Sequence, residues 1–176
     1  KNSIQKLDTN FDLISESENF VKTMGVRGIL FDKNDDKLYV SYIYNDKKTN
    51  CTGVALISSE INNFINISFK EIFKTKCIKY KNLNDFNEMS SGGKIISLNS
   101  ENLLLTVGDF WQNNISQISD KEYGKILKIN KITFDTNIYS MGHRNPQGIT
   151  KMENKIFATE HGPRGGDEIN LIVQDK

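Results

Sequence analysis

The sequence has few of the residues that build disulfide scaffolds, metal clusters and rigid turns. Its 176 residues include two cysteines, two prolines, two histidines and one tryptophan. Two cysteines are too few for a disulfide scaffold, and Cys51 and Cys77 lie in no Cys-x-x-Cys motif, so one bridge or two buried thiols are both open. His143 and His161 have no cysteine near them, which argues against a zinc site.

Charge of one sign and long apolar runs are lacking too. The 23 lysines and arginines nearly balance the 22 aspartates and glutamates, leaving a formal net charge of +1. A nucleic-acid or anionic-lipid partner requires a basic surface, so we expect neither. No apolar run approaches the ~18 residues of a membrane span, so we expect no membrane span. With 37% hydrophobic and 26% charged residues, the composition is that of an ordinary globular protein.

The sequence is rich instead in short stretches of alternating apolar and polar residues, which predict β-strands. Three predicted hairpins share one order of residues: a glycine, an apolar pair, a polar turn, an apolar strand and a hydroxyl residue. They cover residues 28–42, 93–106 and 148–159. A strand unit repeated at this spacing favours a β-propeller, whereas a β-sandwich, the alternative, shows its turns without a longer repeat. We predict no long helix.

The predicted fold class is therefore all-β, with residues 1–176 forming one domain of about three four-stranded blades. Closed propellers have roughly four to eight blades. An open arc of blades exposes sheet edges, which promote aggregation. We therefore expect a truncated, partial β-propeller that belongs to a longer protein.

Two loops on either side of the third hairpin, 141–148 and 160–170, hold both prolines and five of the 12 glycines. Glycine and proline at this density fix unusual backbone angles, which can aim main-chain groups at a ligand. The same loops gather polar side chains that are costly at strand ends unless they bind each other or a ligand. Tight turns between neighbouring blades are the alternative, but the polar content favours a binding site.

The segments Gly142–Gly148 (GHRNPQG) and Thr159–Ile172 (TEHGPRGGDEINLI) closely resemble the soluble quinoprotein glucose/sorbosone dehydrogenases. A looser likeness extends through residues 25–42, 92–109 and 124–130. The resemblance implies a six-bladed β-propeller that oxidises the anomeric carbon of aldose sugars. It also implies pyrroloquinoline quinone (PQQ) held by calcium, a separate electron acceptor, and a periplasmic or secreted location.

The resemblance assigns roles to residues of both loops. Residues assigned to the cofactor site are Arg144, Asn145, Gln147 and Asp167. A guanidinium can hold a quinone oxygen that becomes anionic on reduction, and amides can add donors beside it. Gly162 and Pro163 match the pair whose main-chain carbonyls ligate calcium, an ion that accepts neutral oxygen ligands.

The catalytic positions depart from the family pattern. Asp109 matches the aspartate that orients the family's catalytic histidine, but the histidine position itself falls on Ser90, or on Met89 with a shift of one residue. Neither side chain accepts a proton readily. The family's cofactor-contacting glutamine falls near Thr23. A non-catalytic propeller that binds a ligand is therefore an alternative to a PQQ-dependent aldose dehydrogenase.

Overall fold

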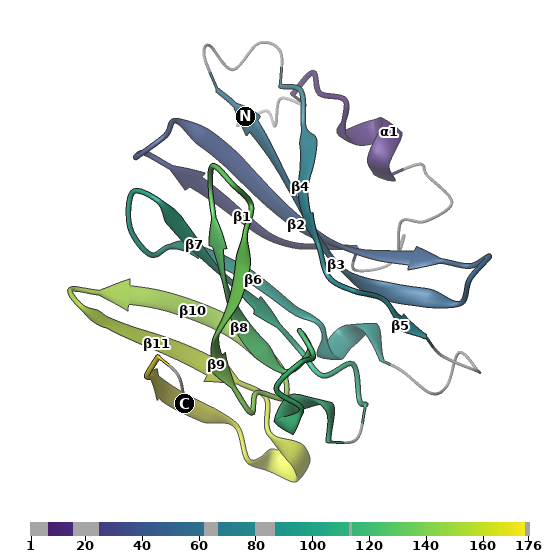
Figure 1. Cartoon of the computed structure of the whole chain (residues 1–176), viewed down its shortest axis with the longest axis vertical. Helices are drawn as coiled ribbons and strands as arrows, with labels where there is room; N and C mark the ends of the chain where they lie inside the picture. Colours follow the sequence, from purple (N-terminus) through teal and green to yellow (C-terminus); the bar gives the residue numbers. More distant parts are fainter. Residues whose placement is uncertain (1–6, 16–24, 62–66, 80–86, 113, 175–176) are drawn as a thin grey trace, which may run out of the picture.

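The computed structural model describes residues 7–15, 25–61, 67–79, 87–112 and 114–174, which form three antiparallel β-sheets (Figure 1). Sheet 1 contains β1 (Val26–Asp32), β2 (Lys37–Asp46), β3 (Cys51–Glu60) and β4 (Lys70–Lys74) in that order, with β5 (Ile78–Lys79) also paired to β3. Sheet 2 contains β6 (Gly92–Ser97), β7 (Asn102–Val107), β8 (Lys125–Asn130) and β9 (Thr136–Met141). Sheet 3 contains β10 (Pro146–Met152), β11 (Lys155–Glu160) and β12 (Glu168–Ile172).

Helical structure in the described residues is limited to short pieces. They are the α-helix α1 (Phe11–Ser15) and the 3₁₀ turns η2 (Glu88–Ser90), η3 (Ile115–Gln117) and η4 (Pro163–Gly165). The prediction of a strand-rich chain without a long helix is confirmed. No described helix is long and apolar enough to cross a membrane.

The three repeated hairpins of the sequence are the first two strands of each sheet. They are β1 with β2, β6 with β7, and β10 with β11. Near its leading glycine, each first strand has a β-bulge, where the pairing register shifts. At the first of these bulges the backbones approach closely, because a Cβ on Gly28 would lie 2.4 Å from the carbonyl oxygen of Gly93. Glycine is therefore required at this position.

The hydroxyl residue of the repeat ties each sheet to the next. The first strands β1, β6 and β10 lie side by side, with β6 in the middle. Ser41 in β2 donates a hydrogen bond to the carbonyl of Gly93 in β6. Thr106 in β7 donates one to the carbonyl of Pro146 in β10 at 3.0 Å. The same feature of two repeats thus joins the second strand of one sheet to the first strand of the next, as expected for neighbouring blades of a propeller.

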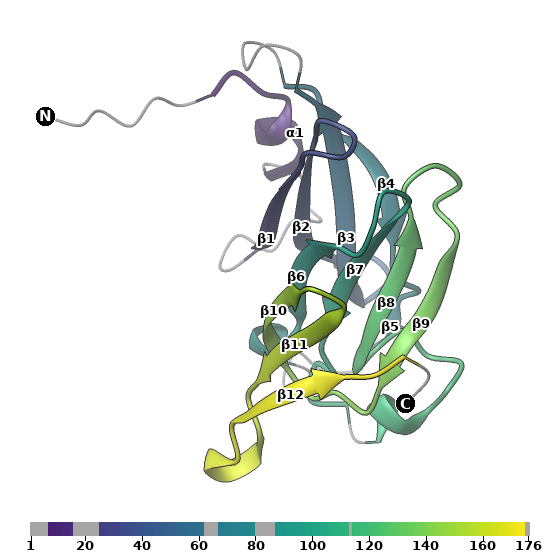
Figure 2. The same ribbon diagram turned by 90° about the vertical axis from the view of Figure 1, so that its left-hand side faces the viewer.

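The three sheets are stacked (Figure 2), and the hydrophobic core lies between them. Leu103 and Leu105 of β7 pack toward sheet 1, whereas Leu104, between them, packs with Ile156 of sheet 3. Because successive side chains of a strand point to opposite faces, β7 is buried on both sides. Sheet 2 is therefore the central layer of the stack.

The outer face of sheet 1 is covered by a segment that the sequence pattern did not reveal. Phe11 and Ile14 of α1 pack against a buried cluster on β2 and β3, and the Phe11 ring meets Phe69 edge to face at 6.1 Å between centroids.

Cys51 and Cys77 form a disulfide, which answers the question that their spacing left open.

Candidate functional site

Three segments that are distant in sequence meet beside the first strands of sheets 2 and 3. Ser90, at the end of η2, donates from Oγ to Asp109 Oδ1 at 2.7 Å. Asp109 follows β7, and its amide donates to the carbonyl of Arg144 at 2.8 Å. Ser90, which stands where the resemblance expects a histidine, therefore lies beside Asp109. Phe110 and Trp111 follow Asp109 with positive φ angles of 53° and 64°, an uncommon backbone that often marks functional sites.

The amide side chains of the 142–148 loop form a second part of this network. Asn145 is buried, and its Oδ1 accepts hydrogen bonds from Gly92 N at 3.3 Å and from Gln147 Nε2 at 2.6 Å. Arg27 in β1 donates from Nη2 to Gln147 Oε1 at 3.1 Å and from Nε to the carbonyl of Gly92 at 3.2 Å. The network thus spans all three sheets.

Sequence reasoning missed Arg27. The sequence offers one sign of it, because Arg27 is a charged residue directly before the apolar start of the predicted hairpin 28–42, where burial of a charge is costly. Burial lowers the pKa of the Arg27 guanidinium, which nevertheless stays charged. Lys94 lies beside it and donates to the Arg27 carbonyl at 2.6 Å. Arg27 thus places a positive charge next to Gln147.

A buried carboxylate that sequence reasoning also missed, that of Glu160, binds two residues of the 142–148 loop. Glu160 accepts a hydrogen bond from the backbone amide of Arg144 through Oε1, and its Oε2 lies 3.0 Å from His143 Nδ1. The other ring nitrogen of His143 lies 2.9 Å from Ser140 Oγ. Burial raises the pKa of Glu160, but the hydrogen bonds from His143 and from backbone amides outweigh it and hold the pKa below its usual value. Both nitrogens of His143 are engaged, so this histidine is structural.

Acid should therefore destabilise the protein through Glu160. Because the pKa of this group is lower in the folded protein than in the unfolded chain, its contribution to stability is present above the unfolded pKa and lost as the pH falls through the folded pKa. We expect Glu160→Gln to lower the unfolding free energy at neutral pH and to flatten its decrease below about pH 5. Urea denaturation at several pH values measures both. Glu153→Gln, in an exposed turn, is the control, and an identical pH dependence for the two variants would contradict the role of Glu160.

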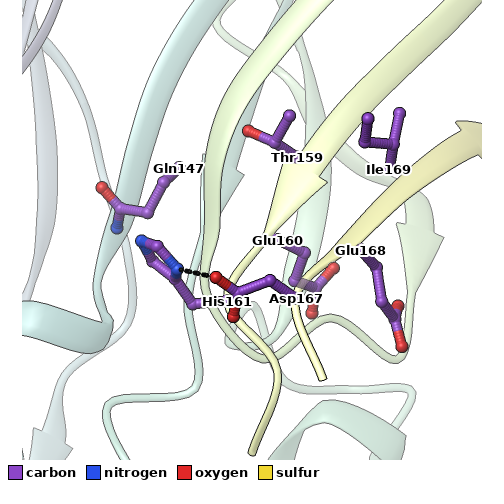
Figure 3. Close-up of a pocket in the computed structure, with 7 residues that line it drawn as sticks. All are labelled: Gln147, Thr159, Glu160, His161, Asp167, Glu168 and Ile169. Carbon is purple, nitrogen blue, oxygen red and sulfur yellow. Dashed lines mark hydrogen bonds and ion pairs between the residues drawn. The ribbon is translucent and has the colours of Figure 1, made fainter. Parts of the chain in front are cut away.

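The second loop carries an exposed histidine–aspartate pair beside a cavity of about 240 Å³ (Figure 3). His161 Nδ1 lies 3.1 Å from Asp167 Oδ2, and Gly162 N donates to Asp167 Oδ1 at 3.2 Å. Gln147 lines the same cavity from β10. The predicted cofactor residues Gln147 and Asp167 are thus brought to one cavity, on opposite sides of the His161 ring.

The carbonyls expected to ligate calcium already accept internal hydrogen bonds. Arg144 Nη1 donates to the carbonyls of His161 at 3.0 Å and Gly162 at 3.1 Å, and the Pro163 carbonyl accepts from Gly166 N at 3.2 Å. The guanidinium puts a positive charge where a cation would bind Gly162. Arg144 would have to leave this carbonyl before calcium could bind it, so this arrangement does not fit the ion, and the calcium site stays a prediction.

No other metal centre is evident in the described part of the chain, because no three His, Cys, Asp or Glu side chains gather there in a metal-binding cluster. Thr23, near which the family's glutamine was expected, lies outside the described residues. Asp109 and Ser90, by contrast, both contact Arg144, and Gln147 contacts both Asn145 and Arg27. The peptide bond between Arg144 and Asn145 joins these two groups.

The three sheets, stacked with β1, β6 and β10 side by side, are blades of a partial β-propeller. The family model "Glucose / Sorbosone dehydrogenase" matches residues 21–176, and the chain belongs to this family. Quinoprotein glucose dehydrogenase B of Acinetobacter calcoaceticus is 30% identical over 113 residues, covering 47% of this chain and 24% of that protein. Aldose sugar dehydrogenase YliI of Escherichia coli K12 is 33% identical over 100 residues, covering 48% of this chain and 27% of that protein.

Solved structures share the fold. The apo form of the soluble aldose sugar dehydrogenase of E. coli aligns with a TM-score of 0.65 and 23% identity, over 81% of this chain and 44% of that one. The PQQ-bound aldose sugar dehydrogenase of Streptomyces coelicolor aligns with a TM-score of 0.64 and 21% identity, over 91% and 48%. The chain thus spans about half the length of these structures and about a quarter of the curated relatives. The predicted β-propeller fold and the family are confirmed.

Proposed function

We propose that this chain holds PQQ and forms part of a protein that oxidises the anomeric carbon of aldose sugars. The observation that carries the proposal is the network joining Asp109, Arg144, Asn145 and Gln147 across the first strands of the blades. The names of the relatives, which include a quinoprotein glucose dehydrogenase and aldose sugar dehydrogenases, support the same substrate class.

The donors of the network suit an anionic quinone. PQQ carries carboxylates and quinone oxygens, which accept hydrogen bonds and favour nearby positive charge. Arg144 and Arg27 supply guanidinium groups, and Asn145 and Gln147 supply amides. When bound, the quinone supplies a two-electron acceptor for sugar oxidation. The residues of this chain would hold and orient it, with Arg144 and the two amides as the direct donors.

A non-catalytic binding module is the second candidate, and Ser90 is the observation that favours it. The Ser90 hydroxyl donates its proton to Asp109 at 2.7 Å, so the position that would hold the family's imidazole is a donor here. A serine in this state takes no proton from a sugar hydroxyl. The two candidates share the cofactor site and differ in whether another group accepts the proton.

The Cys51–Cys77 disulfide is the basis for proposing a periplasmic or secreted location. Disulfides persist in oxidising compartments and are rare where glutathione keeps thiols reduced. The bridge supports a periplasmic or secreted protein. A small-molecule sugar would be its substrate partner, and a separate electron acceptor would reoxidise the reduced cofactor.

Calorimetric titration of the full-length protein with PQQ tests the cofactor proposal. We expect saturable binding at a single site, with and without added sugar, because the donor network is already assembled. Adding calcium to a parallel titration shows whether the ion strengthens binding, as the predicted role of Gly162 and Pro163 requires. A titration with no saturable heat, with or without calcium, would contradict the proposal that the protein binds PQQ.

A further inference from the structure

Of the two histidines in the sequence, the fold leaves one accessible. The His143 side chain is 8% exposed and held between Ser140 and Glu160. The His161 side chain is 58% exposed and faces the cavity shared with Gln147. Any imidazole chemistry in the described part of this site therefore belongs to His161.

The geometry of His161 is that of an oriented base. Asp167 accepts from Nδ1 at 3.1 Å, and Asp167 is itself held by the Gly162 amide at 3.2 Å. A carboxylate that binds Nδ1–H fixes the tautomer and leaves the Nε2 lone pair as a proton acceptor. The ring lies between Asp167 and Gln147 in Figure 3, so its second nitrogen is on the Gln147 side of the cavity.

His161 is also connected to the residues proposed to hold the cofactor. Arg144 Nη1 donates to the His161 carbonyl at 3.0 Å, and Gln147 binds Asn145 at 2.6 Å. Gln147 Nε2 lies 3.5 Å from the carbonyl of Met89, next to the position that lacks the family's histidine. Gln147 thus lies near both His161 and the position where the family has its catalytic histidine.

We propose that His161, positioned by Asp167, is the proton acceptor for sugar oxidation in this protein; the inference rests on the proposed function. The O–H bond of the anomeric hydroxyl breaks and its proton moves to His161 Nε2. The anomeric C–H bond would break with its electron pair, which a bound quinone would accept as hydride, and the C–O bond would become a carbonyl.

Substitution of His161 gives the first test in the full-length protein supplied with PQQ, glucose and a redox dye. His161→Gln should lower kcat by about 100- to 10,000-fold, as loss of a general base does, with the PQQ dissociation constant unchanged. The side chain is exposed, so the melting temperature should not move. Asp167→Asn should lower kcat less, by about 10-fold or more, with recovery in Asp167→Glu. Asp120→Asn removes an exposed carboxylate outside the site and should leave kcat unchanged.

Chemical modification gives a readout that does not depend on turnover. Diethyl pyrocarbonate acylates unprotonated, accessible imidazoles, so it should modify His161 and spare His143. PQQ with sugar should slow the reaction at His161, and Asp167→Asn should change its rate without exposing His143. Equal modification of both histidines, or no protection by the ligands, would overturn the inference.

The outcomes separate the inference from the proposed function. Unchanged kcat in His161→Gln overturns the inference and leaves PQQ-dependent oxidation standing. PQQ binding without turnover in the unmodified protein also overturns it and supports the non-catalytic module. Failure to bind PQQ overturns the proposed function, and the role of His161 falls with it.

Discussion

Replacing Arg144 with methionine should weaken PQQ binding to the full-length protein by about 10- to 100-fold, the usual loss when a charge-assisted hydrogen bond is removed. Methionine keeps much of the length of the side chain and removes the guanidinium. Arg144 belongs to the first loop, where its main-chain groups bind Asp109 and Glu160. Its Nη1 reaches the second loop and binds the carbonyls of His161 and Gly162. Calorimetric titration measures the change in affinity.

Lys155→Met is the matched control for Arg144→Met. Lys155 is exposed at the start of β11, so its replacement removes one positive charge away from the site. We expect the control to bind PQQ as the unmodified protein does. Equal affinities for the two variants, with melting temperatures within a degree or so of the unmodified protein, would show that Arg144 does not contact the quinone.

Replacing Lys131 with methionine should cost about 3–5 kcal/mol of unfolding free energy, the usual cost of leaving a buried charge without its partner. Lys131 follows β8, and its Nζ pairs with Asp32 at the β1–β2 turn, with side chains 3% and 2% exposed. Burial raises the pKa of Asp32, but the hydrogen bonds from Lys131, Asn34 and Ser97 together lower it. The pair links sheet 1 to sheet 2. Without Lys131, the unpaired Asp32 carboxylate would destabilise the contact between these sheets.

Lys121→Met tests the same change at the surface. Lys121 lies 3.8 Å from Asp120, with side chains 52% and 75% exposed, so the loss should stay below about 1 kcal/mol. Asp32→Asn combined with Lys131→Met should recover part of the larger loss, because no unpaired charge remains. Urea denaturation measures all three variants. Equal losses for Lys131→Met and Lys121→Met would contradict the role assigned to the buried pair.

The local pattern of the sequence carries the strands and hairpins but not the contacts between distant segments. Alternating apolar residues and polar turns predict β1 with β2, β6 with β7, and β10 with β11, because both signals are local. The pairing of Lys131 with Asp32 joins residues 99 positions apart, and no periodicity marks it. The packing of α1 on sheet 1 is equally hidden, because the sequence of α1 gives no sign of the face that it covers.

The candidate site divides in the same way. Asp109, Arg144 and Asn145 could be assigned from the sequence because they lie in motifs that resemble a known family. Glu160 acts through its burial beneath His143, which only the fold reveals. Arg27 enters the site because β1 packs against β6, so that its guanidinium reaches Gln147. The sequence does not distinguish the roles of His143 and His161, whereas the structure shows that His143 is buried and His161 is exposed.

The most direct test of the central claim is dye reduction by the full-length protein supplied with PQQ, calcium and glucose. We predict that dye reduction requires both PQQ and sugar, that it is saturable in each, and that it falls in the Arg144→Met variant. Saturated PQQ binding with no sugar-dependent dye reduction, tested across several aldoses, would contradict the claim that this site oxidises sugars and would leave a propeller that binds the cofactor without using it.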